Sequence, residues 1–449
     1  MIAQKAQSTP KEKVRVLQRK LYRAAKGSPR RKFGVLYDKV YRRDVLQEAW
    51  RRVRRNRGSA GVDKQTIAEV EAYGVDRLLD ELECELRERR YRPKLVRRAY
   101  IPKPGKPGER RGLGIPAIRD RVAQAAVKLV IEPILEAYFR DCSYGFRPKR
   151  GAHQAIIEIQ AWVTWGYRKV IDADLRACFD SLPHNGLISA VSRRISDPWI
   201  LRMIRRWLKV GILEEGKVRS AVAGTPQGGV VSPLIANAYL HALDEEWEAK
   251  MRGAKLVRYC DDYVILCRGN PQPWYERMKR IIEGLGLALN AEKTRIVDAA
   301  EGFNFLGMHF RLKPNRSNPR RLFCYRWPST RAMQSIRSKI RDAIGYDDIY
   351  SLEEKIRAIN PILRGWCQYF RIGNAHRHFK KVESYVYTKL VNFMRRKHRR
   401  RGKGFREFPP SFFKKAGLYQ LHGRIVRVSR KPPGEGCRKA GSPRGSCPV

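Results

Sequence analysis

The sequence predicts an α+β fold, in which short β-strands lie among helices and a helical region follows them. Leu256–Cys267 contains two apolar runs rich in β-branched and aromatic residues, which is typical of two strands joined by a tight turn. Lys169–Leu175 has the composition of another buried strand. From Ser329 onward, apolar residues recur at helical spacing, so we expect an all-α region there.

The composition points to a nucleic-acid partner. The chain of 449 residues has 95 Lys and Arg against 44 Asp and Glu, which gives a net charge of +51. Such a surplus is typical of a protein that binds a polyanion, and at about 150 residues per domain the length suggests about three domains. No apolar run approaches a membrane span, so we expect no membrane partner. The nine cysteines form no CxxC pair, which favours a reducing cytoplasm.

Basic helices separated by a glycine loop are expected near the N-terminus. Apolar residues recur at helical spacing in Lys11–Tyr41, Val45–Val53 and Leu78–Leu86, and the loop Asn56–Asp63 precedes the third of these. Arg and Lys crowd between the apolar positions. Such charges are usually a solvated helix face, but their uniform sign favours a surface that faces phosphates.

Tyr100–Pro116 has the pattern of a cationic hairpin. Two short apolar pieces bracket a loop rich in Pro and Gly, with Lys103 and Arg111 on its two arms. Separated cations that close from one side suit a polyphosphate, and the alternative is an ordinary basic loop. Helices are expected to follow, one from Arg119 and one over Ala155–Trp165.

Two acidic clusters lie within the predicted strands. Asp261 and Asp262 are adjacent at the turn of the Leu256–Cys267 hairpin, and Asp172 and Asp174 share one face of the other strand. Neighbouring carboxylates between apolar strands repel each other, and a divalent cation such as Mg²⁺ would relieve that repulsion. The alternatives are a polar turn and a structural aspartate, because matches this short also arise by chance.

Two further motifs lie close to these clusters in the sequence. Pro226–Pro233 carries paired glycines, which let a backbone approach a ligand closely, and Gln227, which offers both a donor and an acceptor. A helix is expected from about Leu234 to Lys250. Asn290–Thr294 enters a further strand and contributes one cation, Lys293.

In their order, these blocks resemble the reverse transcriptases, most closely those encoded by bacterial group II introns. The resemblance covers roughly residues 40–400. The blocks are Asn56–Asp63, Ile101–Lys103 with Arg111–Pro116, Tyr144–Pro148, Asp174–Asp180, Pro226–Gly229 with Ser232–Pro233, Tyr259–Asp262, Asn290–Thr294 and Phe305–Gly307.

The resemblance implies a right-hand polymerase with fingers, palm and thumb. It implies that Asp174, Asp261 and Asp262 are the catalytic carboxylates and bind two Mg²⁺ ions, for which Mn²⁺ is a possible substitute. Two such ions would activate a 3′-hydroxyl and stabilise the leaving pyrophosphate. Asp172 is then a structural residue.

The resemblance also implies roles in binding nucleotide and primer. Phe179 matches the residue whose ring lies under the incoming sugar and excludes a 2′-hydroxyl, and Gln227 matches the residue beside that nucleotide. Lys103 and Arg111 match the cations that bind its triphosphate, whereas Lys293 matches a lysine near the primer end.

Two positions depart from the family pattern. Cys260 replaces the usual small residue of the turn motif, most often Ala, and this change leaves both acids intact. Gly112 replaces the proline that usually follows the arginine of the fingers arm. The loss of that proline should loosen the arm, so the family pattern supports the role of Arg111 less strongly than that of Lys103.

The C-terminal part resembles the thumb of group II intron proteins, which is called domain X or the maturase domain. Asn360–Phe370 contains its Arg364-Gly-Trp366 signature. Aromatic residues interleaved with arginine suit RNA, and the alternative is that at least two of Trp366, Tyr369 and Phe370 belong to the helical core, which leaves RNA binding to Arg364 and nearby cations.

The chain is expected to consist of five parts. They are a basic helical extension (1–40), fingers and palm (41–325), a helical thumb (326–400), a basic DNA-binding-like segment (401–430) and a disordered tail (431–449). After position 400 the only cysteines are Cys437 and Cys447 and the only histidine is His422, so we expect no zinc endonuclease, as in the relatives that lack one.

The leading hypothesis is an RNA-directed DNA polymerase of a mobile group II intron, located in the bacterial cytoplasm at the nucleoid. Its expected partners are the intron RNA, an RNA template with a DNA primer, dNTPs and target DNA, and the oligomeric state is open. The alternatives are an RNA-binding splicing factor without useful polymerase activity and a domesticated reverse transcriptase in defence or repair. The three aspartates argue against the splicing factor, because a binding module has no need of them.

Overall fold

The computed structural model describes residues 8–102, 108–176, 178–214, 217–219, 224, 228–250, 253–346, 349–398, 404–426 and 428. It divides into two compact units. Unit 1 comprises residues up to 155 together with 170–296, and unit 2 comprises residues 156–169 together with those from 297 onward. Helices and strands occur in both units, so the α+β class predicted from the sequence is confirmed.

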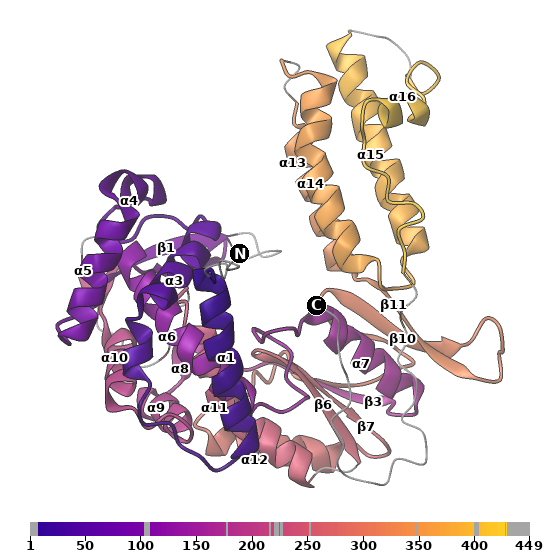
Figure 1. Cartoon of the computed structure of the whole chain (residues 1–449). Helices are drawn as coiled ribbons and strands as arrows, with labels where there is room; N and C mark the ends of the chain where they lie inside the picture. The colour runs from indigo at the N-terminus through magenta and orange to yellow at the C-terminus, as the bar shows by residue number, and fades with distance from the viewer. Residues whose placement is uncertain are drawn as a thin grey trace, which may run out of the picture. The chain divides into compact units, whose positions relative to one another are not determined.

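Unit 1 is built around a helical core in which α1, α3 and α6 lie side by side (Figure 1). Nearly every residue of α6 is buried, including its alanines, so neighbouring helices cover it on all sides. The helices that begin in this unit are α1 Pro10–Gly27, α2 Tyr37–Val40, α3 Arg43–Arg55, α4 Ile67–Tyr73, α5 Val75–Arg87, α6 Ile118–Glu136, α7 Ala152–Thr164, α8 Cys178–Ser181, α9 His184–Ser192, α10 Pro198–Lys209, α11 Ser232–Lys250 and α12 Gln272–Gly284.

The helix predicted over Lys11–Tyr41 is interrupted. A capping box between Thr9 and Glu12 starts α1, which ends at Gly27. Glycine and the proline two residues later both disfavour a continuing helix, and the chain becomes helical again only in the short α2. The other N-terminal helices that the sequence predicts are present.

The cationic hairpin predicted over Tyr100–Pro116 is confirmed. Strands β1 Val96–Pro102 and β2 Arg110–Ile115 are antiparallel, and Ile101 lies opposite Arg111. Strands β4 Ile212–Glu214 and β5 Lys217–Arg219 extend this sheet in the order β2-β1-β4-β5. Lys103 lies outside the described residues.

A second sheet carries the acidic residues. Its strands are β6 Ala254–Tyr259, β7 Asp262–Cys267, β3 Lys169–Ala173 and β8 Arg295–Asp298, in the order β6-β7-β3-β8. Strands β6 and β7 form the predicted antiparallel hairpin. Because β7 neighbours β3, the sheet brings the two acidic clusters of the sequence onto adjacent strands.

Unit 2 combines a three-stranded sheet with a helical layer. Strands β9 Phe303–Phe305, β10 Met308–Pro314 and β11 Leu322–Pro328 pair in the order β11-β10-β9. Helices α13 Thr330–Ile344, α14 Leu352–Phe370 and α15 His376–Lys397 run alongside one another, and the short α16 Pro410–Lys415 follows (Figure 1). The capping box of Ser351 and Glu354 at the start of α14 is confirmed.

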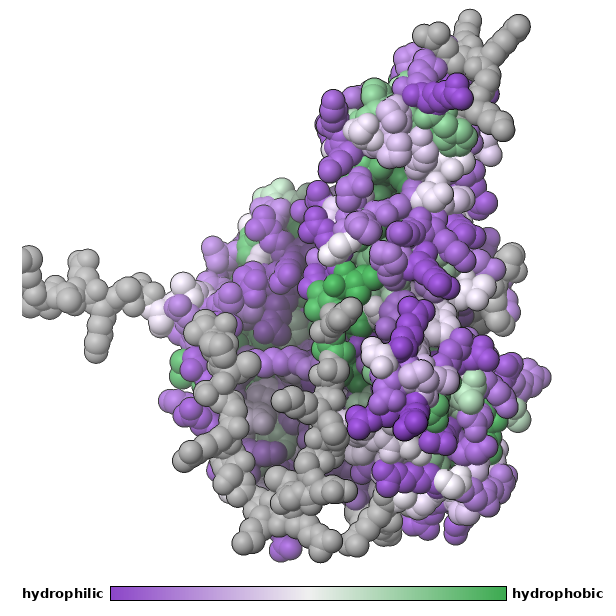
Figure 2. Space-filling model, turned by 90° about the vertical axis from the view of Figure 1, so that its right-hand side faces the viewer, coloured by the Kyte–Doolittle hydropathy of each residue, from purple (hydrophilic) through white to green (hydrophobic). Residues whose placement is uncertain are grey.

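Hydrophilic residues dominate the face shown in Figure 2. Among the residues that the structure describes, no helix combines the length and the apolar composition that crossing a bilayer requires.

Candidate active site

The Asp261–Asp262 pair lies at the tip of the β6–β7 hairpin. Tyr259 is opposite Asp262 in the register, so Cys260 and Asp261 form a two-residue turn. Cys260 is buried and has φ of +63°, a left-handed conformation that non-glycine residues rarely adopt. The side chain of Asp261 is partly exposed and that of Asp262 is exposed, so both acids are open to solvent at the end of a buried hairpin.

Asp174 directly follows strand β3, next to the strand that begins with Asp262. The backbone N–H of Asn290 donates a hydrogen bond of 2.8 Å to the carbonyl of Asp174, and Leu175 forms a β-bridge with Leu289. Asp174 is thus fixed by backbone contacts to a segment more than a hundred residues later in the chain. Asp172 lies within β3 and is partly buried.

Lys293 contacts the carboxylate of Asp174. Its Nζ lies 2.8 Å from Oδ2 of Asp174, in an ion pair whose two side chains are 58% and 33% exposed. The tight turn from Asn290, whose carbonyl accepts a bond of 2.8 Å from the N–H of Thr294, presents this lysine. The hydrogen bond to Asp174 raises the pKa of Lys293. The sequence associated Lys293 with the primer end, and the structure places it against an acid of the cluster.

The acids at this site carry more negative charge than their surroundings neutralise. Although part of its side chain is exposed, desolvation and the charges of Asp261 and Asp174 raise the pKa of Asp262 to about 6. Desolvation likewise raises the pKa of Asp172 to about 6, against the opposing charge of Arg295. Lys293 and Arg295 therefore face several carboxylates whose charges disfavour each other's ionisation.

The donor set fits a hard divalent cation. Carboxylate oxygens are the ligands that Mg²⁺ prefers, and a cation would relieve the repulsion that raises the pKa of Asp262. Within the described ranges, however, no three side chains of His, Cys, Asp or Glu lie close enough together to hold a metal ion as they stand.

Gly228 of the glycine motif lies against the β1–β2 hairpin. Gly228 has φ of +123°, and a Cβ at this position would lie 2.2 Å from the carbonyl oxygen of Gly114 in β2. Both the conformation and the close approach therefore require glycine. Gln227 precedes this contact but lies outside the described residues, as does Lys103. Arg111 is exposed on β2 and takes part in a polar or electrostatic interaction.

Comparison with known proteins identifies two families in the chain. Residues 101–310 match the reverse transcriptase (RNA-dependent DNA polymerase) family, and residues 333–408 match the group II intron maturase-specific domain. Protein YkfC of Escherichia coli (strain K12) is 36% identical over 299 residues, which are 58% of this chain and 77% of that protein. The group II intron-encoded protein LtrA of Lactococcus lactis subsp. cremoris is 28% identical over 341 residues, which are 61% of this chain and 56% of LtrA.

The chain is a reverse transcriptase with a group II intron maturase domain. Its polymerase block spans the strands that carry Asp174, Asp261 and Asp262. The family resemblance inferred from the sequence and the RNA-directed DNA polymerase class that it implied are thereby confirmed.

Phe179 of the reverse transcriptase lies in α8, just after the Asp174 strand. Its ring is partly buried and packs against the hydrophobic core of unit 1. A ring held by the core has a fixed direction, as a sugar-sensing residue requires, and its contact with a nucleotide stays a prediction.

In the maturase domain, Arg364 is exposed on α14 and its guanidinium lies 5.5 Å from the ring centre of Tyr419. This ring contact orients the side chain within unit 2. Of the neighbouring aromatic residues, Phe370 is buried and Trp366 packs on it at 4.9 Å between ring centres. Phe370 therefore belongs to the helical core, whereas Trp366, which packs on it, and Tyr369 are only partly buried.

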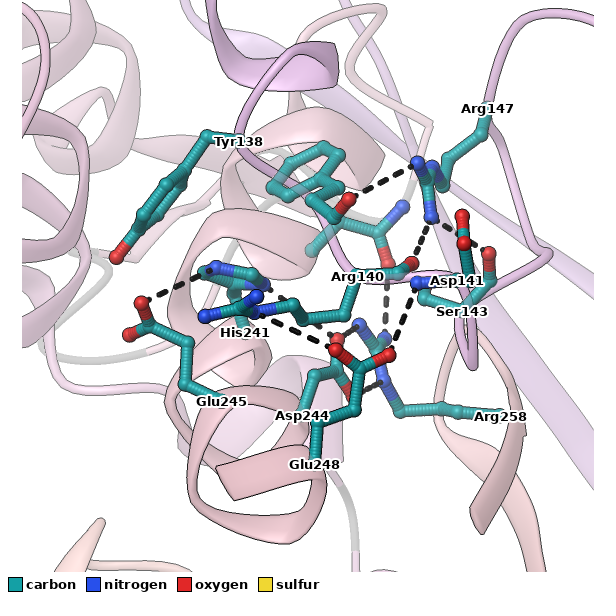
Figure 3. Close-up of polar contacts among 12 residues, drawn as sticks. Tyr138, Arg140, Asp141, Ser143, Arg147, His241, Asp244, Glu245, Glu248 and Arg258 are labelled. Carbon is teal, nitrogen blue, oxygen red and sulfur yellow. Dashed lines mark hydrogen bonds and ion pairs between the residues drawn. The ribbon is translucent and has the colours of Figure 1, made fainter. Parts of the chain in front are cut away.

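The sequence reasoning missed the buried polar residues that contact the β6–β7 hairpin. Arg258 in β6 is buried and pairs with the buried Asp244 of α11 (Figure 3). The available signal was a lone arginine between apolar residues of a predicted core strand, which requires a buried acceptor. The block Tyr144–Pro148 matched the family without a role, and its Arg147 forms a two-pronged ion pair with Glu136 of α6.

Proposed function

We propose that this reverse transcriptase binds the RNA of a mobile group II intron, assists its splicing and copies it into DNA during retrohoming. The presence of a polymerase domain and a maturase domain in one chain supports this assignment. The net charge of +51 suits a protein whose template, primer, intron RNA and DNA target are all polyanions. These partners imply action at the nucleoid, in the bacterial cytoplasm.

We assign the chemistry to Asp174, Asp261 and Asp262. The observation that supports this assignment is that adjacent strands carry the two acidic clusters, so that desolvation and the charges of Asp261 and Asp174 raise the pKa of Asp262 to about 6. Their carboxylates would hold two Mg²⁺ ions, or Mn²⁺ in their place, and these ions supply charge stabilisation for in-line transfer of a nucleotidyl group. Lys293 pairs with Asp174, and in this proposal it contacts the end of the primer.

The remaining residues bind the nucleotide and the nucleic acid. In this proposal, Lys103 and Arg111 approach the triphosphate from the β1–β2 hairpin, while Gln227 and Phe179 contact the nucleotide itself. Unit 1 supplies fingers and palm, and the helices of unit 2 form a thumb in which Arg364 contacts RNA. The parts assigned from the sequence, 1–40, 41–325, 326–400, 401–430 and 431–449, stay predictions.

Primer extension on an RNA template with Mg²⁺ tests the proposal. The wild-type protein should extend a DNA primer with dNTPs, and a variant with Asp261→Ala and Asp262→Ala should not, while both bind the intron RNA with similar affinity. Synthesis by the double variant would remove the aspartates from the chemistry. Tight RNA binding without synthesis by either protein would favour the splicing-factor alternative.

A further inference from the structure

Arg258 is a fully buried cation that lies just before the catalytic turn in the chain. It belongs to β6 with none of its surface exposed, and Asp244 on α11 is equally buried. Its Nε donates a hydrogen bond of 2.8 Å to Oδ1 of Asp244, while Nη2 contacts Oδ2, so the guanidinium and the carboxylate meet edge to edge (Figure 3). This fork geometry fixes the plane of the guanidinium and is specific to arginine.

The remaining nitrogen of Arg258 connects this pair to the catalytic turn. Its Nη1 donates to the backbone carbonyl of Cys260 at 2.9 Å and to Oδ1 of Asn237 at 2.9 Å. Cys260 is the buried turn residue with φ of +63°, and its carbonyl belongs to the peptide that leads into Asp261. A charged donor therefore holds the peptide that determines where the catalytic acids point.

The loop Cys142–Gly145 supports the same turn from a second side. The N–H of Arg258 donates to the carbonyl of Cys142 and the N–H of Tyr144 donates to the carbonyl of Arg258, both at 2.8 Å. Gly145 accepts a bond of 2.8 Å from the amide of Asn237. A Cβ on Gly145 would lie 2.6 Å from the N of Cys260, so the loop touches the turn itself.

We propose that Arg258 is a positioning residue for polymerisation: held by Asp244 and Asn237, it fixes the Cys260 carbonyl and thereby the direction in which Asp261 and Asp262 present their carboxylates. This inference rests on the catalytic role proposed above for the two aspartates. Its physical basis is that Cys260 has a backbone conformation that is rarely populated, and such a conformation persists only where surrounding contacts determine it. Here the Arg258 guanidinium bonds the carbonyl of Cys260, while the loop Cys142–Gly145 packs against the backbone of the same turn.

The consequence is a division of labour within a few residues. Asp261 and Asp262 contact metal and substrate, whereas Arg258 contacts neither and acts through the backbone. Replacing the Arg258 guanidinium should leave nucleotide binding unchanged but alter the orientation of the Asp261 and Asp262 carboxylates. Displacements of about 1 Å at a reacting centre lower rates by up to about 100-fold.

The test compares Arg258→Lys with Arg194→Lys. Lysine keeps the charge but cannot bond Asp244, Asn237 and the Cys260 carbonyl together. Arg194 is a matched control, because it is also buried in unit 1 and donates to the carbonyls of Ala25 and Pro29, away from the hairpin. For each variant we would measure the melting temperature, kcat and KM for dNTP in primer extension, and Mn²⁺ affinity from the electron-spin resonance of free Mn²⁺.

For Arg258→Lys we expect kcat to fall about 10- to 100-fold, KM for dNTP to stay within about twofold, and Mn²⁺ affinity to fall. Arg194→Lys should melt at a lower temperature but keep the wild-type kcat and Mn²⁺ affinity. Equal kcat and equal Mn²⁺ affinity in the two variants would overturn the inference.

Asn237→Ala provides a second route if Arg258→Lys does not fold. It leaves the Arg258–Asp244 pair in place and removes only the contacts of Asn237 with Arg258 and Gly145, so a severalfold loss of kcat at unchanged KM is expected. A wild-type kcat in this variant would count against the inference. An inactive wild type, or an active Asp261→Ala/Asp262→Ala variant, would instead refute the proposed function.

Discussion

Asp244 contacts the β6–β7 hairpin and Asp262 belongs to it, and the protein neutralises the charge of Asp244 but not that of Asp262. Asp244 is fully buried, and a two-pronged ion pair with Arg258 lowers its pKa to about 2 although burial alone would raise it. Asp262 is exposed, and desolvation together with neighbouring acids raises its pKa to about 6. Charge that is fully compensated inside the protein fixes the architecture. Charge that is left in excess at the surface attracts a cation and forms a site.

The largest expected effect comes from removing the charge of Asp262, one of the exposed acids without a full counterion. Asp262→Asn should lower DNA synthesis on the order of 10³-fold, because in the proposed mechanism an amide would be a poor substitute for a carboxylate that binds metal and faces developing charge. Its free energy of unfolding should stay equal or rise slightly, since one of several repelling carboxylates is gone. Primer extension and urea denaturation measure the two quantities, and a large loss of stability would make Asp262 an architectural residue like Asp244.

The corresponding change at the buried Asp244 should lower stability more than it lowers DNA synthesis. Asp244→Asn keeps the shape of the side chain but leaves the buried charge of Arg258 without its counterion, so we expect the free energy of unfolding to fall by about 3–5 kcal/mol. Glu245→Gln on the same helix is the control, because Glu245 pairs with Arg193 at 2.9 Å in a partly exposed contact. That exposed pair should contribute less than about 1 kcal/mol, and equal losses in both variants would contradict the distinction.

Acid pH should remove the contribution of Asp244 without a mutation. Its folded pKa of about 2 lies below the ordinary value of 3.8, so its stabilising effect is fully present above about pH 4 and is lost as the pH falls toward 2. That depression corresponds to about 2 kcal/mol. The difference in unfolding free energy between the wild type and Asp244→Asn should therefore shrink by about this amount from pH 5 to pH 2. If the difference in unfolding free energy between the two proteins stayed constant with pH, the effect of the mutation would come from packing and not from charge.

An added methyl group can test the packing between the loop at Gly145 and the turn at Cys260 directly. In Gly145→Ala the new Cβ would lie 2.6 Å from the N of Cys260, so the loop or the Cys260–Asp261 turn must move. We expect a loss of about 1–3 kcal/mol in unfolding free energy and a lower polymerisation rate. Gly284→Ala is the control, because a Cβ added there, at the end of α12, would have nothing within 4 Å. Unchanged activity in Gly145→Ala would show that the loop moves and the turn does not.

The exposed acids around Asp262 were predictable from the sequence, and the buried Arg258–Asp244 pair was not. Acids such as Asp261 and Asp174 beside apolar strands are conspicuous, because each is locally unfavourable unless it serves a function. The partner of Asp174, Lys293, is 119 residues away in the chain, and no local pattern pairs the two. Arg258 lies inside the stretch that predicted the hairpin, yet its role depends on Asp244 and on a loop near Gly145, which only the packed structure brings to it.

The smallest expected effect concerns the hydroxyl of Tyr263, the residue after Asp262. The side chain is 1% exposed, and its hydroxyl has no hydrogen-bond partner in the part of the chain that the structure describes. Removing an unsatisfied buried hydroxyl should be neutral or stabilising by up to about 1 kcal/mol, so Tyr263→Phe should keep both stability and DNA synthesis.

Tyr91→Phe is the matched control for this hydroxyl. Tyr91 is equally buried, but its hydroxyl donates to Oδ1 of Asp120 at 2.7 Å, so its removal should lower the unfolding free energy by about 1–3 kcal/mol. Thermal melting of the two variants beside the wild type measures the contrast. If Tyr263→Phe lost as much stability as Tyr91→Phe, the hydroxyl of Tyr263 would have a partner in the folded protein. Tyr263 would then be a polar group with a satisfied partner, like Asp244, and the uncompensated groups would end at Asp262.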